Sequence, residues 1–120
     1  MAPRTAQLQP PRAVPHHWFQ ILLALADRSR HGLGILEEVG RQTEGDAQVW
    51  PGMLYVALKK MSDEGLVTEA DPPASFSAGG GRPRFYRITA LGRQLCATEA
   101  ERLARLVDAA RAKRILKEPA

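Results

Sequence analysis

The sequence predicts a mostly α-helical fold with a small β-hairpin, followed by one long helix at its C-terminal end. Apolar residues recur at helical spacing over residues 18–26 and again over residues 33–39. A third amphipathic segment begins at Pro51, and two β-type segments on either side of a glycine-rich loop follow it. Helices followed by a hairpin in this order are typical of a winged helix-turn-helix, and this α+β arrangement is the fold class that we expect.

The length and the distribution of charge limit the classes of function. A chain of 120 residues corresponds to one domain, and its net charge is +4. Residues 82–93 contain four arginines and no acidic residue, whereas residues 18–47 contain three basic and five acidic side chains. A basic excess on one loop favours a polyanionic partner such as double-stranded DNA. The alternative is a charged surface that only keeps the protein in solution.

Several other classes are not expected. Cys96 is the only cysteine, so neither an intrachain disulfide nor a thiolate zinc site is predicted, and we expect no metal and no cofactor. The chain has no long apolar run and no signal-peptide pattern, so we expect a cytoplasmic protein without membrane contact. No nucleophile–base–acid set or catalytic pair of carboxylates is evident, so we do not expect an enzyme.

The first half of the chain is divided by proline, glycine and polar residues. Residues 1–15 contain four prolines and few large apolar residues, which indicates a disordered arm. The first helix, residues 18–26, is apolar on nearly all sides, and residues 27–32 form a polar break. The second helix carries Leu33, Leu36 and Val39 and is expected to end at Gly40 or Gly45.

The third helix is expected to begin at Pro51, since its fixed φ suits the first helical position, and to end at Gly65. Short strands are then expected over residues 66–70 and 82–89, joined by a flexible loop over residues 71–81. The inward stripe of this helix comprises Leu54, Ala57, Leu58 and Met61, and the outer side comprises Gly52, Tyr55, Val56, Lys59 and Asp63. In the second strand, Tyr86 and Ile88 are placed inward.

The last helix is expected over residues 90–116, with Thr89 as its N-cap. Its apolar residues alternate spacings of four and three, as in a coiled coil. The domain organisation is therefore an arm (1–15), a winged helix-turn-helix (16–89), a dimerisation helix (90–116) and a tail (117–120). The predicted dimerisation seam consists of Cys96, Ala100, Leu103, Val107 and Ala110, with Leu106 beside it.

Four motifs in register resemble the PadR-type transcriptional regulators, over about residues 18–93. They are His31-Gly32, Pro51-Gly52-x-Leu54-Tyr55-x-Ala57-Leu58-x-x-Met61, Glu64-Gly65-Leu66-Val67 and Gly80-Gly81-Arg82-Pro83-Arg84-x-Tyr86-x-Ile88-Thr89-x-x-Gly92. The length and the single terminal helix are similar to the short subgroup of that family, in which this helix forms the homodimer.

The resemblance implies a homodimeric repressor that places its third helix in the major groove of a pseudo-palindromic operator and is released by an effector that the sequence does not identify. The implied DNA contacts are Pro51, Gly52, Met53, Tyr55, Lys59, Arg82 and Arg84. The chain differs from many relatives in having Trp50 before the proline, Met53 in place of threonine and Val56 in place of proline. These differences bear on base preference rather than on the fold.

Alternatives remain at several positions. Trp18 and Phe19 are candidates for a small-molecule pocket at the dimer centre, or they pack in the core. Cys96 is a candidate redox switch across the seam, or it is a buried inert thiol. Two rival functions are a winged-helix module that binds another protein and a dimer that binds small molecules without specific DNA binding.

Overall fold

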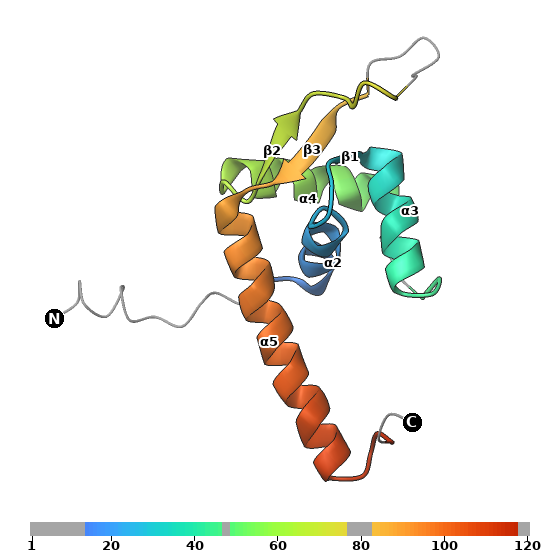
Figure 1. The fold of residues 1–120 in the computed structure, drawn as a ribbon, viewed down its shortest axis with the longest axis vertical. Coiled ribbons are helices and arrows are strands. Elements are labelled where there is room, and N and C mark those ends of the chain that lie inside the picture. The colour runs from blue at the N-terminus through green and yellow to red at the C-terminus, as the bar shows by residue number, and fades with distance from the viewer. Residues whose placement is uncertain (1–13, 47–48, 77–82, 118–120) are drawn as a thin grey trace, which may run out of the picture.

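The computed structural model describes residues 14–46, 49–76 and 83–117 and confirms the expected fold class (Figure 1). Its elements, in chain order, are α2 (His16–Ala24), β1 (Arg30–His31), α3 (Gly32–Gln42), α4 (Pro51–Asp63), β2 (Val67–Ala70), β3 (Phe85–Ile88) and α5 (Ala90–Ala112). The helices α2, α3 and α4 pack together beneath the small sheet, and α5 extends away from them (Figure 1). Most of the predicted N-terminal arm and the glycine-rich loop tip lie outside the described residues.

Helix α2 lies at the centre of the domain because nearly all of its sides are apolar. Ile21, Leu22 and Ala24 are fully buried, and Val14, just before the helix, also packs in the core. The carbonyl end of α2 and the turn after it receive one arginine each: Arg30 Nε donates to Ala24 O at 2.8 Å, and Arg93 Nη2 donates to Ala26 O at 2.8 Å. Cations at this end of a helix satisfy its last carbonyls and favour its dipole.

Helix α3 packs on α2 through Ile35 and Val39, which are almost completely buried. Leu33, which its spacing placed on the same stripe, is 60% exposed instead. It occupies the first turn of the helix, at the edge of the domain, where none of the elements in the described residues covers it. The helix also continues past Gly40 to Gln42, and Gly45 N–H then donates to Gly40 O, so the turn that ends α3 does involve Gly45.

Helix α4 has the predicted boundaries. Pro51 occupies its first position and Trp50 its N-cap, where the indole makes no capping hydrogen bond. At the other end Gly65 has φ 78°, and the Leu66 N–H donates to Met61 O at 2.8 Å, which is the glycine-based helix end expected there. The buried side of α4 consists of Leu54, Ala57, Leu58 and Met61, as the sequence predicted.

The sheet has three strands in the order β1-β3-β2, all antiparallel, whereas only two were expected from the sequence. Strand β1 was missed because it has only two residues and lies in a polar segment. It pairs with β3 through Arg30 opposite Tyr86 and His31 opposite Phe85. Tyr86 and Ile88 are buried as expected, but Phe85 is buried too, because the other face of β3 is also covered.

Helix α5 starts at a cap that joins it to the rest of the domain. The Thr89 hydroxyl accepts a hydrogen bond from Gly92 N–H at 3.0 Å, which confirms the predicted N-cap. The same hydroxyl donates to Gly65 O at 2.6 Å. Gly92 lies against the strand: a Cβ there would be 2.1 Å from Leu66 O. This close approach explains why the last motif ends in glycine.

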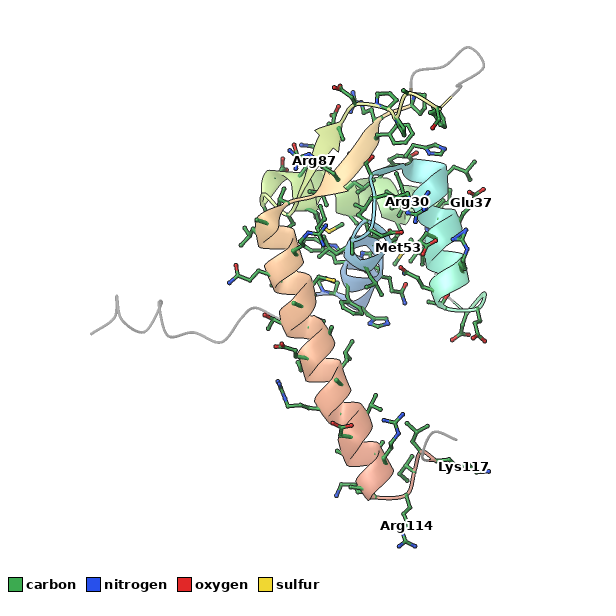
Figure 2. All side chains as sticks on the ribbon, in the orientation of Figure 1. Arg30, Glu37, Met53, Arg87, Arg114 and Lys117 are labelled. Carbon is green, nitrogen blue, oxygen red and sulfur yellow. The ribbon has the colours of Figure 1, made fainter. Side chains whose placement is uncertain are left out.

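The helix is four residues shorter than predicted. It ends at Ala112, and Arg114 has φ 66°. Ile115 N–H donates to Ala110 O at 2.9 Å and Arg114 N–H to Arg111 O at 3.0 Å, the hydrogen-bond pair that closes many helix C-termini. The prediction failed because an arginine rather than a glycine adopts the left-handed conformation. Figure 2 shows Arg114 and Lys117 at the end of α5 that is farthest from the sheet.

Candidate nucleic-acid interface

The outer side of α4 is an exposed surface that is apolar at its centre and basic at its edge. Its members are on successive helical turns, because residues three and four apart share one face of a helix. Tyr55 is 53% exposed and Val56 58% exposed, and the side chain of Lys59 is 76% exposed. We call Gly52, Tyr55, Val56, Lys59, Lys60 and Asp63 the outer face of α4; Pro51 beside it is exposed, and Met53 is partly buried.

The phenol of Tyr55 crosses to the start of α3. A Cβ on Gly32 would lie 2.1 Å from the Tyr55 hydroxyl oxygen and 2.8 Å from Cζ. The ring therefore rests on the backbone of Gly32, and the absence of a side chain there sets its position. His31-Gly32 and Tyr55 belong to separate motifs in the sequence, and the structure brings Gly32 and Tyr55 into contact.

A groove of about 310 Å³ separates α4 from the hairpin formed by β2 and β3. Arg84, next to β3, lies on the hairpin side of this groove and Lys59 on the helix side. The structure thus brings these two predicted contact residues onto one surface, although 25 positions separate them in the sequence. The residues that line the groove are Tyr55, Leu58, Lys59, Ser62, Asp63, Glu69, Arg84 and Tyr86. Arg82 lies outside the described residues.

Each of these two cations has a carboxylate nearby. Lys59 Nζ lies 3.4 Å from Asp63 Oδ2, and Arg84 Nη1 lies 3.8 Å from Glu69 Oε2. All four side chains are at least 60% exposed, so each pair contributes little to folding stability. The pairs do change the electrostatic field of the groove, because each acid partly neutralises the cation beside it. Glu69 was not among the residues predicted for this surface.

An aromatic cluster holds the base of the hairpin. The rings of His31, Phe76 and Phe85 have centroids 4.9–5.1 Å apart, and Phe76 meets Phe85 edge to face. Phe76 lies in the segment that was expected to be a flexible loop. Residues 71–76 contain neither helix nor strand, as expected, but the Phe76 ring contacts the domain. His31 does stand at the N-cap of α3, but its ring packs on phenylalanines and makes no capping hydrogen bond.

The predicted dimerisation seam divides into two parts. Cys96 is buried within this chain, and Leu103 is partly buried against the core. Ala100, between them, is exposed. Beyond Leu103 α5 leaves the domain, so that Leu106 is 56% exposed and Val107 is exposed too, while Ala110 is half-buried. The second half of the seam therefore presents apolar side chains to solvent.

Two buried titratable groups, Cys96 and Glu99, lie in the docked half of α5. Burial raises the pKa of the Cys96 thiol, with the nearby charge of Arg93 opposing it, so the unreactive thiol form is favoured. Glu99 is buried, and Arg102 binds it through Nε to Oε1 at 3.0 Å and Nη2 to Oε2 at 2.6 Å. These hydrogen bonds hold the pKa of Glu99 below its ordinary value. Neither the seam nor the motifs indicated this ion pair between a buried carboxylate and a half-exposed arginine.

Trp18 and Phe19 lie in the hydrophobic core, 6% and 9% exposed. The structure places them in ordinary packing contacts of α2 and away from the groove beside α4. Across residues 14–46, 49–76 and 83–117, no group of three or more His, Cys, Asp or Glu side chains could hold a metal ion. No helix in the same ranges is long and apolar enough to cross a bilayer.

The chain is similar to several proteins of known sequence or structure. It is 26% identical over 73 residues to an uncharacterised protein from Lysinibacillus sphaericus, a match that covers 61% of this chain and 64% of that protein. The fold is similar to a PadR family transcription regulator from Clostridium difficile (TM-score 0.60, 21% identity, 82% of this chain and 99% of that one). It is also similar to Bacillus subtilis PadR solved with operator DNA (TM-score 0.57, 20% identity, 69% and 45%).

The family follows from a sequence match rather than from these likenesses of fold. The sequence profile of the PadR-like family of transcriptional regulators matches residues 21–98, which is well over half of the chain and runs from the second half of α2 into the docked half of α5. This protein therefore belongs to the PadR-like family of transcriptional regulators.

Proposed function

We propose that this regulator is a homodimeric repressor that binds a pseudo-palindromic operator through α4 and the hairpin. The single observation that carries the proposal is the outer face of α4, which is exposed along its length and shares a groove with Arg84. The major groove of B-DNA, about 12 Å wide, admits one α-helix. The structure of Bacillus subtilis PadR with operator DNA supports a duplex as the ligand.

The role of each side chain in DNA binding follows from its chemistry. Lys59 is a flexible point charge, and Arg84 is an exposed guanidinium beside the hairpin, so both are suited to phosphates. The Tyr55 hydroxyl lies at the start of α3, where it can donate to a phosphate that also faces the free N–H groups of that helix end. These contacts fix the position of the duplex and do not themselves read its sequence.

The proposed dimer uses the exposed half of α5. Leu106 and Val107 would lose contact with water against a second copy of the helix, and burial of apolar surface favours that association. Two recognition helices related by a two-fold axis then meet half-sites about 34 Å apart, one turn of DNA. Occupation of the operator would exclude polymerase, and an effector of unknown identity would relieve it.

Fluorescence anisotropy against the upstream region of the protein's own gene, beside a scrambled duplex, tests this proposal at two salt concentrations. We expect preference for the upstream duplex by about a hundredfold or more. Lys59→Ala should weaken binding to both duplexes and reduce the salt slope by about one unit, whereas Lys113→Ala at the far end of α5 should leave the slope unchanged.

Equal, weak binding to both duplexes that vanishes with salt would contradict sequence-specific binding at that site. In that case a selection from random duplexes would separate an operator elsewhere in the genome from a protein that does not recognise DNA sequence. An unchanged salt slope for Lys59→Ala would remove Lys59 from the phosphate contacts while leaving the rest of the proposal in place.

A further inference from the structure

The helix proposed to enter the major groove has an unusual composition for a base reader. Residues 51–63 contain no Arg, Asn or Gln, so among the side chains that make paired hydrogen bonds to guanine or adenine only Lys59 and Lys60 are present. The polar groups on the outer face of α4 are the Tyr55 phenol, the two lysines and Asp63. Tyr55 rests on Gly32, and Lys59 and Lys60 lie on either side of the central line of the helix.

The middle of this face is apolar. At 100° per residue, Val56 lies between Lys59 and Lys60 and one turn after Gly52. Helical side chains lean toward the N-terminus and cover the preceding turn. Gly52 has no side chain, and a Cβ there would meet no atom closer than 4.0 Å. The isopropyl group of Val56, 58% exposed, is therefore the first side chain to project on the central line of the helix.

An exposed valine in this position has one apolar partner in the major groove. The C5 methyl of thymine is the apolar group that base pairs present there, whereas G·C pairs present only donors and acceptors. A valine can neither donate nor accept a hydrogen bond, so a G·C pair opposite it would lose water without compensation.

We infer that Val56 reads a thymine methyl group in each operator half-site. The inference rests on the proposed function and deepens it, because it names the base that α4 recognises. Burying one methyl group corresponds to about 0.8 kcal/mol, or roughly a fourfold change in affinity, for each thymine contacted. The operator half-site should thus contain a T·A pair that cannot be replaced by C·G.

Selection followed by removal of single methyl groups tests the inference. The full chain is first used to enrich binders from a pool of random duplexes. Each thymine of the enriched half-site is then replaced in turn by deoxyuridine, which removes the methyl and keeps the base pair. At one thymine position, wild type should lose about fourfold in affinity. Val56→Ala should bind the thymine duplex about as weakly as wild type binds the uracil duplex, and should not distinguish the two.

The control is Leu91→Ala, an equally exposed apolar side chain on the first turn of α5, which should retain the fourfold discrimination. Because Val56 and Leu91 are both exposed, neither substitution should disturb folding, and circular dichroism melting checks this. If Val56→Ala still bound the uracil duplex more weakly than the thymine duplex, the inference would be overturned. Another residue, such as Met53, would then contact the thymine methyl group.

The remaining outcomes separate this inference from the function on which it rests. An enriched half-site without an invariant thymine, or one insensitive to uracil throughout, would overturn the inference while preserving sequence-specific binding. A pool that shows no enrichment would instead overturn the proposed function.

Discussion

Helices α4 and α5 are both amphipathic, but they are bound to the domain in different ways. Helix α4 buries a residue on every turn, namely Leu54, Ala57, Leu58 and Met61, so its whole length is attached to the core. In α5 the buried residues are Gly92, Cys96 and Glu99, all in the first half. From there the helix runs away from the domain (Figure 1).

The two helices also expose different kinds of surface. The outer face of α4 carries Lys59 and Lys60, and water solvates these charges well. The free half of α5 carries Leu106 and Val107, and Ile115 just after it is 82% exposed. A charged face can remain in water or bind a polyanion, whereas an apolar face gains free energy only by burial. The comparison therefore predicts two partners, a duplex for α4 and a second copy for α5.

The largest expected effect comes from detaching the docked start of α5. Gly92→Ala would place a methyl group 2.1 Å from Leu66 O, which is backbone and cannot move aside like a side chain. We expect a loss of about 3 kcal/mol in the free energy of unfolding, measured by urea denaturation. Ala97→Gly, on an exposed side of the same helix, should cost only about 1 kcal/mol. Equal losses would show that Gly92 is not a packing requirement.

The next effect concerns the free half of α5. The double substitution Leu106→Lys and Val107→Lys puts two charges into the proposed dimer contact, and we expect sedimentation velocity to show a monomer at concentrations where wild type is a dimer. Glu101→Lys places a lysine on the opposite, exposed side and should leave the dimer intact. A double variant that remains dimeric would show that the subunits associate elsewhere.

A smaller effect is expected on the face of α4. Asp63→Asn removes the carboxylate 3.4 Å from Lys59 Nζ and also removes a charge that repels phosphates. We expect duplex affinity to rise by about threefold, because exposed ion pairs contribute about 1 kcal/mol or less. Anisotropy measures the change, with Asp108→Asn on the free half of α5 as the matched control. A fall in affinity for Asp63→Asn would mean that the carboxylate orients Lys59 for binding.

The smallest effect is a pH dependence at the last buried position of α5. Since Arg102 holds the pKa of Glu99 below its ordinary value of 4.5, ionised Glu99 stabilises the fold above that pH. This contribution is lost as the pH falls through the folded-state pKa. The difference in melting temperature between wild type and Glu99→Gln should therefore be constant near neutral pH and shrink below about pH 4.5. A difference in melting temperature that grows as the pH falls would contradict the expected direction of the effect.

Much of the fold could be predicted because local signals agreed with the packing. Pro51 and Gly65 mark the ends of α4, and Thr89 marks the start of α5, through backbone preferences that act within a few residues. The apolar stripe of α4 could be predicted equally well, because a helix whose apolar residues recur at helical spacing buries that one side almost wherever it packs. Strand β1 lacked such a signal, since two polar residues have no period.

The candidate site was predicted only in part. Tyr55, Lys59 and Arg84 came from motifs, and Asp63 was expected on the same side of the helix as Lys59. The position of Glu69 beside Arg84 and the support of Tyr55 by Gly32 depend on elements that the chain brings together from a distance. Spacing along α5 suggested one continuous seam, although Cys96 turned out to contact its own domain. A sequence pattern cannot distinguish burial within the chain's own domain from burial against a second copy of the chain.

The sequence by itself determined where the helices begin and end, which side of each is apolar, and that basic residues gather before and within the last strand. It could do so because capping, periodicity and charge are properties of residues close together in the chain. Only the tertiary structure decided that the His31 ring packs on Phe76 and Phe85, that Gly92 touches Leu66, and that α5 leaves the domain halfway along. These depend on distances between residues far apart in the chain, which are settled when the core packs.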